Sequence, residues 1–127
     1  LWELNFGTLP DVMAGIATRK VKWDRNYQRK HGIGTGPATD LPEGLAPRVA
    51  QLARRIYRAL CLSGYARIDL RLKPDGSVFV LEANANPNLA QIEDLATSAL
   101  SSGVGYDDLL ERIMRFGLAY QAAWRQA

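Results

Sequence analysis

The side chains that could do chemistry in this chain lie in one stretch, Tyr65 to Leu89, around which the rest of the sequence is organised. Arg67 and Asp69 come first, and Glu82 and Asn84 follow some fifteen residues later. Asp, Glu and Asn offer only oxygen ligands, which suit a hard cation such as Mg²⁺. The planar guanidinium of an arginine can bind a phosphate or acyl-phosphate oxygen beside such an ion.

The segments that carry these four residues are expected to form a β-hairpin. Ala66–Leu72 alternates apolar and polar residues, and Ser77–Ala83 is rich in β-branched and aromatic residues. Pro74-Asp75-Gly76 separates them, and Asp-Gly between two such segments is a strong hairpin signal. A two-residue Asp-Gly loop would pair the apolar residues of the two strands across one face, as Leu72 with Phe79, Leu70 with Leu81 and Ile68 with Ala83.

The same register places Asp69 opposite Glu82, and Arg67 opposite Asn84, on the other face of the hairpin. Two carboxylates that face each other repel, so a neighbouring positive charge must offset the repulsion. A divalent cation would do this, and so would a surface salt-bridge cluster of Arg67, Asp69 and Glu82, since such ion pairs are common and nearly neutral in energy. Spacing alone leaves both interpretations open.

A family resemblance favours the metal. Arg67-x-Asp69, the Asp-Gly turn, and Glu82-Ala-Asn84-x-Asn86-Pro together resemble the closing motif of ATP-grasp ligases, most closely those of the D-alanine–D-alanine ligase type. The resemblance implies that Asp69, Glu82 and Asn84 hold two Mg²⁺ ions on the phosphates of ATP, with Glu82 bridging them. It also implies that Arg67 contacts the transferred phosphoryl group. More weakly, it extends from about residue 20 to the C-terminus.

One segment departs from that family. The ligases usually continue with Ser-Pro-Gly-Met, whereas this chain has Asn86-Pro87-Asn88-Leu89. In the ligases the glycine lets backbone N–H groups approach the second amino acid. With Asn88 in place of that glycine, the identity of the second substrate stays open. We expect Asn86 and Asn88 to help hold substrate.

Composition sets broad limits on the class of protein. The chain has 127 residues, a formal net charge of +3 and a pI near 9.2, which fit one soluble domain that binds anionic small molecules such as ATP and do not require nucleic acid. No apolar run approaches the ~20 residues of a membrane span. The single cysteine, Cys61, lies in an apolar stretch and is expected to be buried, and a reducing cytoplasm is the simplest setting.

The N-terminal third is expected to be mostly strand. Leu1–Phe6 alternates and begins without Met, so we expect residues 1–127 to be one domain excised from a longer protein, without the preceding subdomain that supplies lysines and a glycine-rich phosphate loop. Gly7–Asp11 is expected to be a turn, and Gly15–Asp24 is read as a second strand. Lys22 on it could contact phosphate, as could Arg29 or Lys30, and a solvated basic edge explains any one of them equally well.

The remaining segments are expected to be connectors and helices. His31 is interpreted as a surface loop residue, and Gly32–Pro37 as a mobile loop near the site or a plain connector. Apolar residues at helical spacing predict a helix from Leu41 to about Leu62, which presents an arginine-rich face. A short helix is expected at 91–100, and a final helix, capped by Asp107, to about Trp124.

Together these features predict an α+β fold, an antiparallel sheet with helices packed on one face, as the C-terminal half of an ATP-grasp domain. The resemblance implies ATP-dependent ligation of a carboxylate to an amine through an acyl phosphate. ATP and Mg²⁺ would be the cofactors, and Mn²⁺ would also fit. We expect no nucleic-acid or membrane partner, and a homodimer stays open. Two alternative functions stay open. The chain could be a catalytically silent relative that binds nucleotide or a partner, or a structural domain in which the acids form a salt-bridge cluster.

Overall fold

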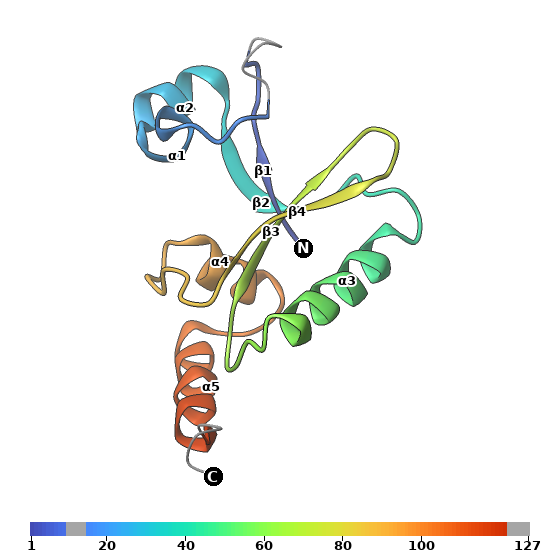
Figure 1. Cartoon of the computed structure of the whole chain (residues 1–127). Helices are drawn as coiled ribbons and strands as arrows, with labels where there is room; N and C mark the ends of the chain where they lie inside the picture. Colours follow the sequence, from blue (N-terminus) through green and yellow to red (C-terminus); the bar gives the residue numbers. More distant parts are fainter. Residues whose placement is uncertain (10–14, 122–127) are drawn as a thin grey trace. The chain divides into compact units, whose positions relative to one another are not determined.

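The computed structural model describes residues 1–9 and 15–121, and the chain divides into two compact units, 1–39 and 40–127. Each unit contains an antiparallel pair of strands together with helices (Figure 1). The α+β class and the antiparallel pairing expected from the sequence are confirmed. In the described part of the chain, the strands form two separate two-stranded sheets, one in each unit.

The sheet of the first unit is made by β1 (Trp2–Asn5) and β2 (Gly34–Pro37). They pair antiparallel from Trp2 opposite Pro37 to Asn5 opposite Gly34. The expected strand at the start of the chain is confirmed. The interpretation of 32–37 as a loop or connector was wrong for 34–37, because these residues pair with β1, whereas 32–33 form no strand.

Two short helices, α1 (Arg19–Trp23) and α2 (Arg25–His31), follow β1 in the chain. The strand expected at 15–24 was therefore wrong. The Thr18 hydroxyl accepts a hydrogen bond from the amide of the third helical residue at 3.4 Å, and Asp24 Oδ1 accepts two from the first turn of α2 at 3.0 Å. These caps favour a helix. The alternation of charged and apolar residues in this segment is too short to distinguish the period of a strand from that of a helix. His31 ends α2 and is not a loop residue.

A small apolar core holds the first unit together. One of its turns depends on a glycine, because a Cβ on Gly7 would lie 1.9 Å from the carbonyl oxygen of His31. The neighbouring amide of Thr8 donates to that same oxygen at 2.9 Å. The turn expected at 7–11 is described only as far as residue 9, and 10–11 lie outside the described residues. The core consists of buried Leu9, Val21 and Ile33, with half-buried Leu4, Phe6 and Tyr27 against them.

Over its described residues, 40–121, the second unit contains three helices and a hairpin (Figure 1). The helix expected at 41–62 is shorter at both ends, and Gly44 is its N-cap. The final helix begins one residue before Asp107, so Gly105 and not Asp107 is the N-cap, and 122–124 lie outside the described residues. The elements are α3 (Leu45–Ala59), β3 (Arg67–Leu72), β4 (Val78–Asn84), α4 (Asp94–Ser101) and α5 (Tyr106–Ala119).

The helix α3 buries Leu45 and Val49 and leaves its arginines exposed, as its periodicity predicted. Beyond its C-terminal end, the expectation of a buried Cys61 was wrong. This residue is exposed and has a left-handed backbone with φ +51°, because the chain reverses direction there between the helix and the hairpin. None of the described helices combines the length and apolar character that crossing a bilayer requires.

Candidate functional site

The turn of the β3–β4 hairpin has a three-residue loop. The Lys73 amide donates to the Ser77 carbonyl oxygen and the Gly76 amide donates to the Lys73 carbonyl oxygen, both at 2.9 Å. Gly76 has φ +79°, a left-handed value that glycine adopts without strain. Asp75 Oδ1 accepts from the Ser77 amide at 2.9 Å, and this bond lowers the pKa of the Asp75 carboxyl below its usual value. The two-residue loop expected from the sequence was therefore wrong.

The longer loop shifts the pairing next to it by one residue, so that Leu72 lies opposite Val78 and not opposite Phe79. A β-bulge then reverses the shift. Leu70 pairs with Val80 while Asp69 pairs with Glu82, and Leu81 is the extra residue between them. As a result, the predicted pairings of Asp69 with Glu82, Arg67 with Asn84 and Ile68 with Ala83 are confirmed, and those of Leu70 and Leu72 were wrong.

Three charged side chains are in contact on one face of the hairpin. Arg67 Nε donates to Asp69 Oδ1 at 2.7 Å, and its Nη2 donates to Asp69 Oδ2 at 3.1 Å and to Glu82 Oε1 at 3.2 Å. Asp69 is bound by both arms of the fork, a geometry that fixes orientation as well as charge. The acids that face each other are thus bridged by the guanidinium.

The electrostatics of this cluster leave it able to take a further cation. The hydrogen bond to Asp69 and the charges of both acids raise the pKa of Arg67, so it stays protonated. One guanidinium against two carboxylates leaves the cluster with a net charge of −1. Side-chain exposures of 35% for Arg67, 32% for Asp69 and 54% for Glu82 put it within reach of solvent. Such exposed pairs contribute about 0–1 kcal/mol each, so a ligand can rearrange them at small cost.

The loop that follows β4 is shaped by asparagine side chains. Asn84 Oδ1 accepts from the Asn86 amide at 2.9 Å, and Asn88 Oδ1 accepts from the Ala90 amide at 3.0 Å. These bonds from a side chain to the backbone two residues on are Asx turns. The Asx turn of Asn84 fixes the position of its amide oxygen and the start of the loop. Asn86 and Asn88 follow on this loop, and both are exposed.

Two tyrosine hydroxyls tether that loop. The Tyr65 hydroxyl donates to Asn86 Oδ1 at 3.3 Å, and the Tyr106 hydroxyl at the start of α5 donates to the Leu89 carbonyl oxygen at 3.0 Å. Between these points Pro87 is buried. Sequence reasoning missed both tyrosines, because nothing in their spacing distinguishes a hydroxyl that tethers a loop from an ordinary half-buried tyrosine.

Lys22 is the one expected site residue that lies in the other unit. It is exposed on α1, whereas Arg67, Asp69, Glu82, Asn84, Asn86 and Asn88 all belong to the hairpin and the loop after it. The structure therefore brings the expected metal and phosphate residues of the hairpin together. The choice among Lys22, Arg29 and Lys30 stays a prediction.

Comparison with known proteins identifies the family. A family model described as the D-ala D-ala ligase C-terminus matches residues 16–115. The chain belongs to this family. Its fold accordingly is that of a D-alanine–D-alanine ligase-like ATP-grasp C-terminal domain, as the motif suggested.

Individual relatives agree with this assignment. The chain is 36% identical over 117 residues to a D-alanine–D-alanine ligase of Geotalea uraniireducens, which covers 88% of the chain and 37% of the relative. With the ligase of Lactobacillus acidophilus it shares 33% identity over 112 residues, covering 88% and 30%. The chain thus spans about a third of the length of these curated relatives.

Solved structures show the same correspondence. A crystal structure of the D-alanine–D-alanine ligase of Bacillus anthracis matches with a TM-score of 0.62 and 35% identity, over 68% of this chain and 28% of that one. A structure of the ligase from the same organism complexed with ATP matches with a TM-score of 0.59 and 38% identity, over 63% and 28%.

The donor set of this ligase-family hairpin fits Mg²⁺. Asp69, Glu82 and Asn84 each offer a side-chain oxygen, and Glu82 Oε2 accepts no hydrogen bond from any described residue. The described residues contain no cluster of three or more His, Cys, Asp or Glu that could form an all-protein metal cage. Mg²⁺ is usually bound by one or two carboxylates when substrate phosphates and water complete its shell.

Proposed function

We propose that this chain is the C-terminal part of an ATP-dependent carboxylate–amine ligase and supplies its metal- and phosphate-binding residues. The observation that carries the proposal is the hairpin face on which Asp69 and Glu82 pair directly and Arg67 contacts both. Membership of the D-alanine–D-alanine ligase family supports it. The length of the relatives supports a larger parent protein. In that parent, residues 1–127 would form one domain and a preceding subdomain would complete the nucleotide site.

The roles proposed for the acids follow from their donor atoms. Asp69 and Glu82 would hold Mg²⁺ through carboxylate oxygens, and Asn84 would add its amide oxygen. When bound, the metal neutralises the charge on the transferring phosphoryl group. Asn84 Oδ1 keeps a lone pair for this task, since an amide oxygen has two and the Asn86 amide uses one.

Arg67 would bind the transferring phosphoryl group directly. Its Nε and Nη2 are committed to the two acids, but Nη1 has no hydrogen bond to any described residue. Nη1 carries two N–H donors, so the same side chain can orient the acids and still donate to phosphoryl oxygens. Hydrogen-bond donors that are in place before charge develops on the phosphoryl group stabilise the transition state efficiently.

The proposed reaction has two steps. A substrate carboxylate oxygen attacks the γ-phosphorus of ATP, ADP leaves and an acyl phosphate forms. The amine nitrogen of the second substrate then attacks the acyl carbon and loses a proton to solvent, and inorganic phosphate leaves with the electron pair of the C–O bond. Asn86 and Asn88, on the tethered loop, would hold substrate, and Lys22 would contribute positive charge toward phosphate. A cytoplasmic setting suits an enzyme that uses ATP and small-molecule substrates.

Phosphate release by the full-length protein tests this proposal. With Mg²⁺, ATP, a carboxylate and an amine, the wild type should turn over ATP, and Glu82→Gln should reduce the rate by at least about 100-fold. Glu111→Gln is the matched control, because Glu111 also pairs with an arginine, Arg115, on exposed α5. Turnover that survives Glu82→Gln would exclude the metal role. Nucleotide binding without turnover in the wild type would instead indicate the catalytically silent relative.

A further inference from the structure

The loop that follows β4 presents hydrogen-bond donors to solvent. Asn86 Oδ1 accepts from the Tyr65 hydroxyl at 3.3 Å, and Asn88 Oδ1 accepts from the Ala90 amide at 3.0 Å. These bonds orient both carboxamides by their oxygens, and the two Nδ2 groups make no hydrogen bond with any described residue. Each Nδ2 carries two N–H donors, and both side chains are exposed. The loop therefore suits a ligand that offers a hydrogen-bond acceptor.

The chain segment that contains this loop carries no positively charged side chain. Residues 74–111 run from the hairpin turn into α5 and include no Lys, Arg or His. They include seven acidic residues, so a carboxylate on a ligand at the loop would meet acids of this segment and no cation of it. The seven acids are Asp75, Glu82, Glu93, Asp94, Asp107, Asp108 and Glu111.

The two helices after the loop do not supply positive charge either. The N-terminal end of a helix favours an anion, but the first turn of α4 contains Asp94, and that of α5 contains Asp107 and Asp108. Glu93, the N-cap of α4, is half-buried, and its carboxylate makes no hydrogen bond or ion pair with any described residue. These acidic side chains already offset the partial positive charge of the helix ends.

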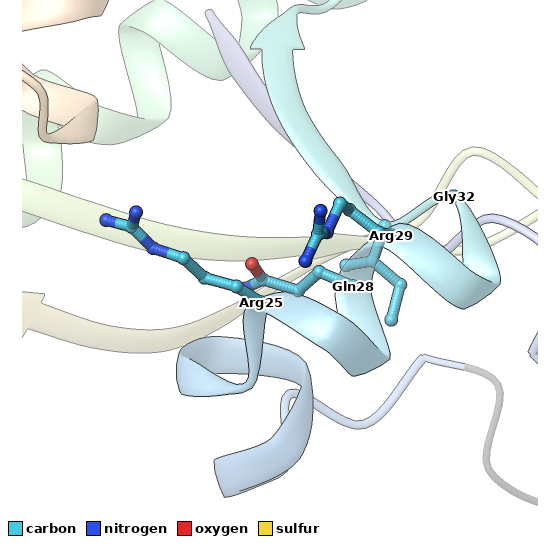
Figure 2. Close-up of a pocket in the computed structure, with 5 residues that line it drawn as sticks. Arg25, Gln28, Arg29 and Gly32 are labelled. Carbon is cyan, nitrogen blue, oxygen red and sulfur yellow. The ribbon is translucent and has the colours of Figure 1, made fainter.

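The cations of the chain lie in other segments. Arg67 is the cation of β3 at the loop end of the hairpin, since its partner Asn84 precedes the loop, and Arg71 lies farther toward the turn. Arg67 Nε and Nη2 donate to the two acids of the site, and its Nη1 is proposed to bind the phosphoryl group. In the first unit arginines do line a pocket, and Figure 2 shows Arg25 and Arg29 there on α2. The loop after β4 differs, because its own polar side chains are neutral amides.

In the proposed reaction this loop is left for the amine substrate. The carboxylate substrate reacts at the phosphoryl group, which Arg67 and the metal ligands would hold. Asn84 is the last of those residues along the chain, and Asn86 and Asn88 follow it on the loop. A molecule bound to their Nδ2 groups would therefore be the second substrate, the amine.

Given the proposed function, on which this inference rests, we propose that the amine substrate carries an amide carbonyl next to its amino group, as the N-terminus of a peptide does, and no free carboxylate there. The Nδ2 groups of Asn86 and Asn88 can donate to a neutral amide carbonyl. A carboxylate in the same place would be repelled by the acids of the segment and would lack a cationic partner. Attraction of one group and repulsion of its competitor together give specificity.

Amine binding to the full-length protein, saturated with Mg²⁺ and a non-hydrolysable ATP analogue, tests the proposal. Alaninamide and alanine of the same hand differ only in the amide that replaces the carboxylate. Ligand-observed NMR gives the Kd of alaninamide, and displacement of bound alaninamide by alanine gives the affinity of alanine for the same site. Alaninamide of at least one hand should bind at least about 10-fold more tightly than alanine. Equal or tighter binding of alanine, or no binding of alaninamide, would overturn the proposal.

An isosteric variant separates recognition by donors from general attraction, because alaninamide is positively charged. Asn88→Asp keeps the oxygen that accepts from Ala90 but replaces the Nδ2 donors with a negative charge. Recognition by the donors predicts at least about 10-fold weaker binding of alaninamide. Attraction to the acids alone predicts tighter binding, and unchanged or tighter binding would overturn the proposal.

Asn5→Asp is the matched control for this variant. Asn5 is exposed in the first unit, and its Oδ1 also accepts from an amide two residues on, that of Gly7, at 2.7 Å. The substitution adds the same charge and keeps the same kind of turn, so the affinity for alaninamide should stay within about twofold. An equal weakening in both variants would show that the added charge, and not the loss of donors at Asn88, is responsible, and would overturn the proposal.

Failure of this inference and failure of the ligase proposal give different results. If the full-length protein releases phosphate and joins alanine in preference to alaninamide, the ligase function stands and the substrate class is wrong. If the amines bind in the expected order but no phosphate is released with any carboxylate, the ligase function is contradicted and the preference of the loop stands.

Discussion

The role proposed for Arg67 combines two tasks. Its Nε and Nη2 donate to the two acids, and its Nη1 would donate to the ligand. The raised pKa means that it carries its charge throughout the working pH range. A group whose pKa is raised on folding loses its stabilising effect only when the pH rises through that pKa, so Arg67 should add no pH dependence to stability near neutrality.

Replacing Arg67 with lysine tests whether ATP turnover depends on the two-armed geometry of the guanidinium or on its charge alone. Arg67→Lys keeps the charge but loses bidentate bonding to Asp69 and the second arm toward phosphate. We expect ATP turnover by the full-length protein to fall about 100-fold, while the free energy of unfolding changes by less than about 1 kcal/mol, because the cluster is partly exposed. Arg115→Lys on α5 is the control and should change neither quantity. Near wild-type turnover in Arg67→Lys would show that charge alone suffices.

The hairpin shows how far an element can be predicted from its sequence. The Asp-Gly signal and the alternation found the two strands, and the pairing of Asp69 with Glu82 was predicted correctly although the loop length was not. The longer loop and the bulge at Leu81 each shift the pairing register by one residue. The two shifts cancel, so the predicted register is correct at Asp69 and Glu82. Neither leaves a clear sequence signal, because Pro-Asp-Gly suits both loop lengths and any apolar residue can occupy the bulge.

Gly76 is the point on which the loop geometry depends. Gly76→Ala should cost about 1–2 kcal/mol in the free energy of unfolding, since φ +79° is left-handed and an alanine there is strained. A Cβ at this position meets no atom within 4 Å, so the effect would be conformational and not steric. Gly34→Ala, where the φ is not left-handed and space is equally free, is the control in urea unfolding. Equal effects of the two substitutions would refute the assigned turn.

The loop after β4 is fixed by contacts that sequence patterns cannot show. Its asparagines were expected to hold substrate, but its two tyrosine tethers come from segments 21 and 17 residues away in the chain. Similarly, the strand expected at 15–24 became two capped helices, because Thr18 and Asp24 satisfy the helix ends. In both cases the deciding interactions are side-chain hydrogen bonds, which residue periodicity does not encode.

Removing one tether should loosen the loop without abolishing the site. Tyr106→Phe deletes the bond to the Leu89 carbonyl oxygen, and we expect a loss of about 1 kcal/mol in the free energy of unfolding. If the loop holds substrate, KM for substrate should rise several-fold in the full-length protein and kcat should change less. Tyr120→Phe is the control, because Tyr120 is 58% exposed. An equal fall in kcat without a change in KM would exclude this positioning role.

The whole chain has two compact units and about a third of the length of its curated relatives. The family motif in the hairpin was sufficient to predict the family, and the family model confirms it over residues 16–115. What the motif could not predict was the detailed arrangement of the N-terminal unit. There the basic residues are spread over two short helices, and pattern alone could not choose among Lys22, Arg29 and Lys30.

At this scale we expect the 127-residue chain alone to lack ligase activity, because the proposed partner subdomain would supply the other half of the nucleotide site. Phosphate release should stay at background with ATP, Mg²⁺ and a panel of carboxylates and amines. The full-length protein should be active under the same conditions. Turnover by the chain alone would mean that the hairpin unit is sufficient for catalysis.

The central claim is that Asp69 and Glu82 pair across the hairpin in order to hold a metal on nucleotide phosphates. Counting bound Mn²⁺ by electron paramagnetic resonance, in the full-length protein saturated with a non-hydrolysable ATP analogue, tests it most directly. We expect tight, nucleotide-dependent Mn²⁺ binding in the wild type and in Glu111→Gln, and at least about 10-fold weaker binding in Asp69→Asn and Glu82→Gln. Unchanged Mn²⁺ affinity in both of the latter variants would contradict the claim.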